Sequence, residues 1–103
     1  MKRGVCKNIL YDNAINLIKN NDVVIIDVRD LNEKKDISLP GSINITNNEL
    51  ITKIKKIVPD KNQFIFVYCS SGSRSIFACQ ILADLGYNKV YNLQGGLHWI
   101  LDN

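Results

Sequence analysis

The sequence predicts an α/β fold with a mainly parallel sheet of about five strands and helices on both faces. Short runs of β-branched and aromatic residues alternate with segments in which apolar residues recur at helical spacing. Strand–helix–strand units connect through right-handed crossovers, and such crossovers join parallel strands. At 103 residues the chain is one domain, residues 1–103, of which we expect about the first six to be disordered.

The first half of the chain predicts three strands and one long helix. Residues 6–10 favour a short strand, and the spacing of apolar residues predicts a helix over residues 11–20. Residues 23–27 form a continuous run typical of a central strand that is covered on both faces. The polar residues 30–36 predict one helical turn in a surface loop. A proline–glycine pair predicts a turn before another short strand at residues 42–45.

The second half continues the alternation. Residues 48–58 show amphipathic helical spacing, and the proline that follows them stops the helix. Residues 64–68 predict a buried strand, and residues 75–85 predict a helix that ends at a glycine. Residues 89–92 predict a last short strand, and residues 97–101 a terminal helical turn.

The composition, with 46% hydrophobic and 22% charged residues, is that of an ordinary globular domain. No apolar run reaches the roughly 18 residues of a membrane span, and the N-terminus lacks the apolar stretch of a signal peptide. The formal charge is +3, with lysines spread along the chain, whereas a nucleic-acid footprint is denser. We therefore expect a cytoplasmic protein with no membrane and no nucleic-acid partner, of unspecified oligomeric state.

Three cysteines and a single histidine limit the metal and redox chemistry. The cysteine spacings fit neither a disulfide framework nor a zinc site, so no metal or organic cofactor is implied. Cys79 falls on the apolar side of its helix, where we expect a small core residue. Cys6 lies in an unanchored terminal segment and has no assigned role. His98 is expected to cap a helix or to pack beside Trp99.

Cys69 is the residue around which the chain is organised. It follows the strand at 64–68, and only six residues, Cys69 to Arg74, separate that strand from the next helix. Small residues around a central glycine let backbone N–H groups turn inward as an anion-binding nest, to which the helix start adds its own donors. With the cation of Arg74, these donors should lower the pKa of the Cys69 thiol from its free value of about 8.5. The alternative is an inert cysteine buried at a strand end.

A thiolate held by backbone donors needs no histidine base. Cys69 could attack a sulfur atom of a donor and hold that atom as a persulfide, after which an acceptor would take the outer sulfur in a ping-pong reaction. The N–H groups of the loop would stabilise the developing charge, as an oxyanion hole does for oxygen.

Four motifs resemble those of the rhodanese family of sulfurtransferases and follow one another in the family's order. The loop with its flanking residues, 68–75, is similar to the family's active-site loop, Cys-x-x-Gly-x-Arg-Ser. Residues 25–29 (IIDVR) with Glu33, residues 40–45 (PGSINI) and residues 91–96 (YNLQGG) resemble three further family segments. Together the motifs span nearly the whole chain from about residue 22 onward.

The resemblance implies a single-domain sulfurtransferase in which Cys69 is the catalytic nucleophile. The donor would be thiosulfate or a persulfide, and the acceptor a thiol or a protein. Because Arg74 is the only formal positive charge in the loop, a persulfide donor is at least as well suited as the dianion thiosulfate. The residues implied to form the substrate-binding loop are Ser70, Ser71, Gly72, Ser73 and Arg74.

Supporting roles fall to Ser75, Asp27 and Arg29. Asp27 and Arg29 lie at and just after the end of the strand predicted at 23–27, whose carboxyl end should meet that of the strand before Cys69. Asp27 would accept backbone N–H groups near the loop while Arg29 orients neighbouring segments. The alternative is a purely structural ion pair, for instance between Arg29 and Glu33.

Other functions remain open. Cysteine-dependent phosphatases use the same loop design but place one more residue between cysteine and arginine than the four here, and a histidine where Tyr68 stands. A non-catalytic binding or regulatory module typically replaces the cysteine, which this chain keeps. A persulfide carrier that serves a partner protein cannot be separated from a free-standing sulfurtransferase.

Overall fold

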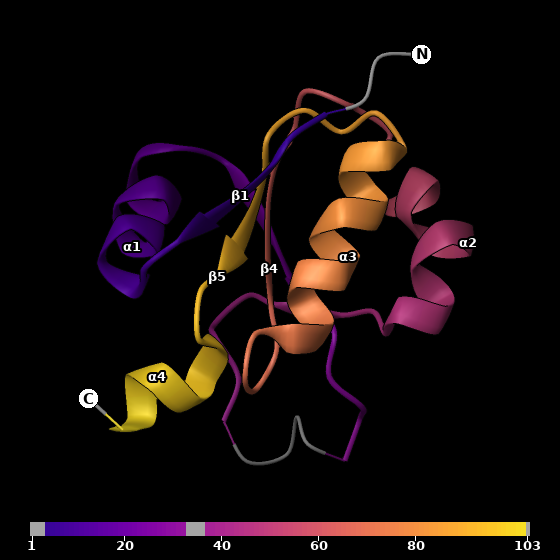
Figure 1. Cartoon of the computed structure of the whole chain (residues 1–103). Helices are drawn as coiled ribbons and strands as arrows, with labels where there is room; N and C mark the ends of the chain where they lie inside the picture. Colours follow the sequence, from indigo (N-terminus) through magenta and orange to yellow (C-terminus); the bar gives the residue numbers. More distant parts are fainter. Residues whose placement is uncertain (1–3, 33–36, 103) are drawn as a thin grey trace.

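The structure is a computed structural model that describes residues 4–32 and 37–102. Within them, five strands form one sheet in the order β1-β5-β4-β2-β3, and neighbouring strands run parallel. Figure 1 shows α2 and α3 on one face of this sheet and α1 on the other. The predicted fold class is therefore confirmed. The strands are β1 (Cys6–Ile9), β2 (Val23–Asp27), β3 (Ile43–Asn44), β4 (Phe64–Tyr68) and β5 (Val90–Leu93), and the helices are α1 (Tyr11–Asn20), α2 (Asn47–Ile57), α3 (Ser73–Asp84) and α4 (Gly96–Asp102).

Most element bounds agree with the sequence-based expectations to within one residue, and the clearest differences are in β3 and at the start of α3. β3 has two residues because Ser42 belongs to the preceding turn, where its N–H donates to the carbonyl oxygen of Leu39. α3 begins at Ser73, two residues earlier than expected, so the loop before it is shorter. The expected helical turn at 30–36 lies partly outside the described residues. Among the described helices, none has the length and apolarity needed to cross a membrane.

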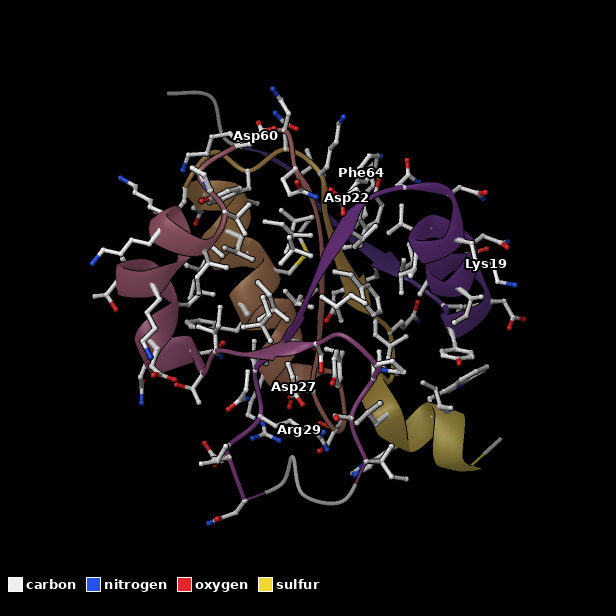
Figure 2. The ribbon with its side chains drawn as sticks, turned by 180° about the vertical axis from the view of Figure 1, so that it is seen from behind. Lys19, Asp22, Asp27, Arg29, Asp60 and Phe64 are labelled. Atoms are coloured by element: carbon white, nitrogen blue, oxygen red, sulfur yellow. A yellow bond between two sulfur atoms is a disulfide. The ribbon has the colours of Figure 1, made fainter. Side chains whose placement is uncertain are left out.

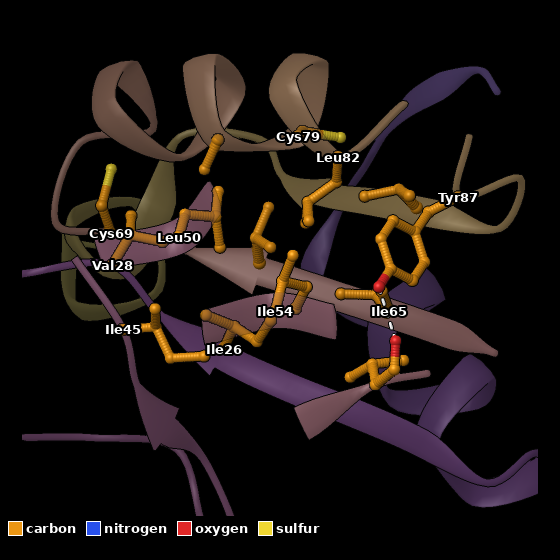
Figure 3. Packing of buried hydrophobic residues seen from close by; sticks show 14 residues of the cluster. Ile26, Val28, Ile45, Leu50, Ile54, Ile65, Cys69, Cys79, Leu82 and Tyr87 are labelled. Atoms are coloured by element: carbon orange, nitrogen blue, oxygen red, sulfur yellow. Dashed lines mark hydrogen bonds between the residues drawn. The ribbon is translucent and has the colours of Figure 1, made fainter. Parts of the chain in front are cut away.

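Two hydrophobic clusters lie on opposite faces of the sheet because the central strands are buried on both. Ile65 and Val67 of β4 point into the cluster under α2 and α3, and Phe66 and Tyr68 into the cluster under α1 and α4. Figure 3 shows the first cluster, in which the buried Tyr87 hydroxyl donates to the carbonyl oxygen of Val58. Because β4 is buried on both faces, it must lie in the centre of the sheet. Cys69, the residue after β4, therefore lies at the carboxyl end of a central strand.

The register of β2 on β4 brings two sequence motifs to one edge of the sheet. Asp27 pairs with Tyr68, so the two strands end together. The N–H of Val28 donates to the carbonyl oxygen of Tyr68 at 3.1 Å and extends the pairing by one residue. Residues 27–29 therefore lie beside Tyr68 and Cys69, as the parallel topology predicts.

Cys79 is buried in the core, as expected, but the expectations that Cys6 has no role and that the cysteines fit no disulfide are wrong, because these two residues form a disulfide. Cys6 lies in β1 rather than in an unanchored segment, and the N–H of Gly4 just before it donates to the carbonyl oxygen of Ala83 at 2.7 Å. The two cysteines are 73 residues apart in sequence. They meet because β1 pairs with β5 at the edge of the sheet, beside α3. The spacing of the cysteines in the sequence does not predict this contact, because it depends on the order of the strands in the sheet.

Candidate active site

The loop between β4 and α3 surrounds the Cys69 sulfur with donors. Gly72 has φ +96°, a left-handed conformation that glycine adopts without steric cost, and α3 starts directly after it. The N–H groups of Gly72 and Ser75 donate to Cys69 Sγ at 3.1 and 3.3 Å. Cys69 itself is fully buried in the cluster under α3. The predicted nest is therefore present, and its donors come from the last loop residue and the first turn of the helix.

The Ser75 hydroxyl can form a hydrogen bond with Cys69 in either protonation state of the sulfur. Its oxygen is 3.3 Å from Cys69 Sγ and 3.3 Å from the carbonyl oxygen of Gly72. When Cys69 is a thiol, its S–H donates to the Ser75 oxygen and the hydroxyl donates to Gly72. When Cys69 is a thiolate, the same hydroxyl can rotate and donate to sulfur instead.

Two opposing effects set the pKa of Cys69. Burial raises this pKa, but hydrogen bonds from the Ser75 hydroxyl and from the backbone N–H groups of Ser75, Gly72 and Arg74 outweigh burial and lower it. The net lowering favours the nucleophilic thiolate.

The carbonyl groups of the loop are held by neighbouring elements, away from the sulfur. Those of Cys69 and Ser70 accept the N–H groups of Leu97 and His98 at 3.0 and 2.8 Å. The carbonyl of Arg74 accepts the side-chain amide of Asn47 at 3.1 Å. α4 and the start of α2 thus orient the loop so that its N–H groups face inward, an arrangement that the sequence did not reveal.

The serines of the loop differ in their surroundings. Ser71 and Ser73 are exposed, with their hydroxyl oxygens 3.1 Å apart, whereas Ser70 is half-buried. Arg74 is also half-buried at the start of α3. The exposed pair therefore lies on the solvent side of the loop.

Asp27 and Arg29 form a buried ion pair beside the loop. The guanidinium donates to both carboxylate oxygens, with Nη2 to Oδ2 at 2.9 Å and Nε to Oδ1 at 3.1 Å, and the Arg29 backbone N–H donates at 2.9 Å. Asp27 holds the pKa of Arg29 above its usual value. Figure 2 labels both residues at the end of β2. These contacts favour the structural alternative, but the partner is Asp27, whereas Glu33 lies outside the described residues.

Tyr68 connects this ion pair to the segment before β3. Its buried hydroxyl oxygen accepts the N–H of Leu39 at 3.0 Å and lies 3.1 Å from Asp27 Oδ2 and 3.0 Å from Ser42 Oγ. The sequence alone assigns Tyr68 no role, although a buried tyrosine hydroxyl at the end of a strand needs hydrogen-bond partners. Through Tyr68, the residue before the nucleophile is fixed to two other segments.

Gly96 is a second residue whose role only the structure shows. A Cβ atom there would lie 2.6 Å from the carbonyl oxygens of both Cys69 and Ser70, and its φ is +61°. We expect Gly96→Ala to displace the loop that holds Cys69. It should lower kcat for a reaction at Cys69 about 100-fold, since a misplacement of reacting groups by about 1 Å can slow a reaction by this factor. The matched control is Gly41→Ala, because Gly41 has φ +79° but no atom within 4 Å of the added Cβ. Comparable kcat values for the two variants would contradict this role for Gly96.

The described part of the chain contains no cluster of side chains suited to bind a metal ion. Within residues 4–32 and 37–102, no three histidine, cysteine or carboxylate side chains gather as ligands for a metal ion. His98 is exposed on α4, and its backbone N–H is the group that contacts the loop.

Comparison with known proteins identifies relatives of this fold and loop. The family model of the rhodanese-like domain matches residues 10–103. Thiosulfate sulfurtransferase PspE from Escherichia coli is 40% identical over 70 residues, which cover 68% of this chain and 67% of that relative. A rhodanese-related protein from Thermoplasma volcanium superimposes with a TM-score of 0.79 at 31% identity, covering 94% of this chain and 93% of that one. A Rhodopseudomonas palustris protein of unknown function, described as a possible tyrosine phosphatase, gives a TM-score of 0.83 at 31% identity, with 94% and 80% covered.

Proposed function

Because the chain belongs to the rhodanese-like domain family, we propose that it is a sulfurtransferase working through a persulfide on Cys69. The observation that carries the proposal is the set of N–H and O–H donors around Cys69 Sγ, which lowers the pKa of this thiol without a histidine. Such a site stabilises a sulfur anion, and both the thiolate and the persulfide are sulfur anions.

The reaction consists of two displacements at sulfur. In the first, the Cys69 thiolate attacks the outer sulfur of the donor, and the donor's S–S bond breaks with its electron pair on the leaving group, which is sulfite if the donor is thiosulfate. In the second, an acceptor thiolate attacks the outer sulfur of the persulfide and regenerates the Cys69 thiolate. The donors from Gly72 and Ser75 already contact Cys69 Sγ before either step begins.

The identity of the donor is the finer part of the proposal. The relative PspE is named a thiosulfate sulfurtransferase, which supports thiosulfate. A persulfide on a small thiol or on a protein is the second candidate, because Arg74 is the only formal cation between Cys69 and Ser75. A protein acceptor would make the chain a carrier of sulfur to a partner.

The test compares three substrates in single-turnover reactions: thiosulfate, a low-molecular-weight persulfide and an aryl phosphate. One equivalent of sulfite released from thiosulfate supports the thiosulfate donor, and transfer from the persulfide alone supports the second candidate. Phosphate release would overturn the proposal in favour of a phosphatase. A folded protein that transfers sulfur from neither donor would be a binding module instead.

The lowered pKa of Cys69 predicts the pH dependence of the first displacement. The rate should rise with pH as the thiolate forms and reach its plateau at a lower pH than for a free cysteine, because the hydrogen bonds favour the thiolate. Ser75→Ala removes one of these bonds and should move the profile toward alkaline pH, with a rate about tenfold lower at neutral pH.

The matched control is Thr52→Ala, which removes an exposed hydroxyl from α2. It should leave the pH profile unchanged. An unshifted profile for Ser75→Ala would show that the Ser75 hydroxyl does not stabilise the thiolate.

A further inference from the structure

The Cys6–Cys79 disulfide is placed where it fastens the edge of the sheet to the helix of the active site. The two Cα atoms are 5.5 Å apart, within the range that a disulfide bridges without movement of the backbone. Cys79 is fully buried in the second turn of α3, the helix whose first turn contributes donors to Cys69. Figure 3 shows Cys79 on α3 and Cys69 apart from it, in the loop before the helix.

Without the disulfide, β1 is held mainly by its pairing with β5. It is a four-residue edge strand, Lys7 and Asn8 are exposed, and neither Cys6 nor Ile9 is fully buried. Its contacts with α3 are reinforced by the hydrogen bond from Gly4 to Ala83. An edge strand that buries so little apolar surface gains little free energy from packing, so a covalent bond is an effective anchor.

We propose that Cys6 and Cys79 form a native structural disulfide, and that the chain therefore matures and works under oxidising conditions rather than in the cytoplasm. Structural disulfides form and persist in oxidising compartments and are rare where thiols are kept reduced. Formation is a two-electron oxidation in which both thiols lose their protons and a disulfide oxidant of the glutathione class is reduced to two thiols.

The disulfide also has a consequence for sulfur transfer, which rests on the proposed function. The sequence has three cysteines, and with two of them bonded Cys69 is the remaining thiol. A persulfide on Cys69 then has no second thiol in this chain that could take its outer sulfur. The sulfur can leave only to an acceptor from outside, and the buried Cys79 is protected from exchange.

The first test counts thiols in protein folded in a buffer of oxidised and reduced glutathione. The denatured protein is alkylated with N-ethylmaleimide, weighed intact, and digested for peptide mapping. We expect one adduct, on Cys69, and a linked peptide that joins Cys6 to Cys79; after reduction we expect three adducts. Three adducts before reduction would overturn the proposal. This readout does not involve sulfur transfer, so it fails or succeeds independently of the proposed function.

The second test compares melting temperatures with and without a phosphine reductant. Reduction should lower the Tm of the wild type by about 15 °C or more, because the bond closes a long loop. Cys6→Ala leaves the buried Cys79 in place and should melt like the reduced wild type, with no further response to reductant. Cys69→Ala should keep the full response. An unchanged Tm on reduction of the linked protein would contradict a structural role for the bond.

Discussion

Cys69→Ser is expected to abolish sulfur transfer, with a loss of at least about 10⁴-fold in kcat/KM, while the protein remains folded. A serine hydroxyl at this position stays protonated at neutral pH and cannot hold a sulfur atom as a persulfide. The swap changes little volume, and the donors that contact the sulfur can also donate to an oxygen. The measurement is the single-turnover rate with thiosulfate and with a low-molecular-weight persulfide.

Two controls make this result specific. Because Cys69 is fully buried, the variant must also be shown to keep a cooperative thermal transition close to that of the wild type. Cys6→Ala lacks the disulfide but keeps the nucleophile, and it should transfer sulfur at temperatures where it is folded. Transfer by the serine variant above the uncatalysed rate would contradict the mechanism.

Asp27→Ala is expected to destabilise the fold by about 3–5 kcal/mol, because it leaves a buried guanidinium without its partner. Arg29 is only 4% exposed, and Asp27 accepts three of its N–H groups. The Tyr68 hydroxyl also loses a neighbour at 3.1 Å. Since domains of this size are stable by about 5–15 kcal/mol, the expected loss is a large fraction of the total. The measurement is the free energy of unfolding in urea.

The double variant Asp27→Ala/Arg29→Met separates the ion pair from the other contacts of Asp27. Removing the second charge as well should restore much of the stability, because a buried pair can be replaced by apolar groups at little cost. Equal destabilisation in the single and double variants would show that the unpaired charge is not the cause.

The sequence was sufficient for much of the fold because its central strands are apolar on both faces. The bounds of α1, β2 and β4 were predicted to the residue, since each is marked by a clear change in periodicity. The position of Cys69 after β4 followed from this pattern. The predicted start of α3 was two residues too late, because Ser73 and Arg74 are polar and add nothing to the apolar spacing. The helix begins directly after Gly72, whose left-handed conformation could not be predicted from the apolar pattern.

The parts that could not be predicted depend on contacts between distant segments. The Cys6–Cys79 bond can form only because β1 lies beside α3. The local sequence of a parallel edge strand does not indicate which elements lie next to it. The close approach of Gly96 to the carbonyl groups of the loop is likewise a property of the packed chain. A structural ion pair of Arg29 was anticipated with Glu33 as the example of a partner, whereas the structure pairs Arg29 with Asp27, which depends on the fold of the Arg29 side chain back onto β2.

The measurement that tests the central proposal most directly is the intact mass of the protein after incubation with thiosulfate or with a low-molecular-weight persulfide. We expect a gain equal to one sulfur atom, lost again on addition of an acceptor thiol, and absent in Cys69→Ser. Peptide mapping should place the added sulfur on Cys69. A folded wild-type protein that gains no sulfur from either donor would contradict the persulfide mechanism.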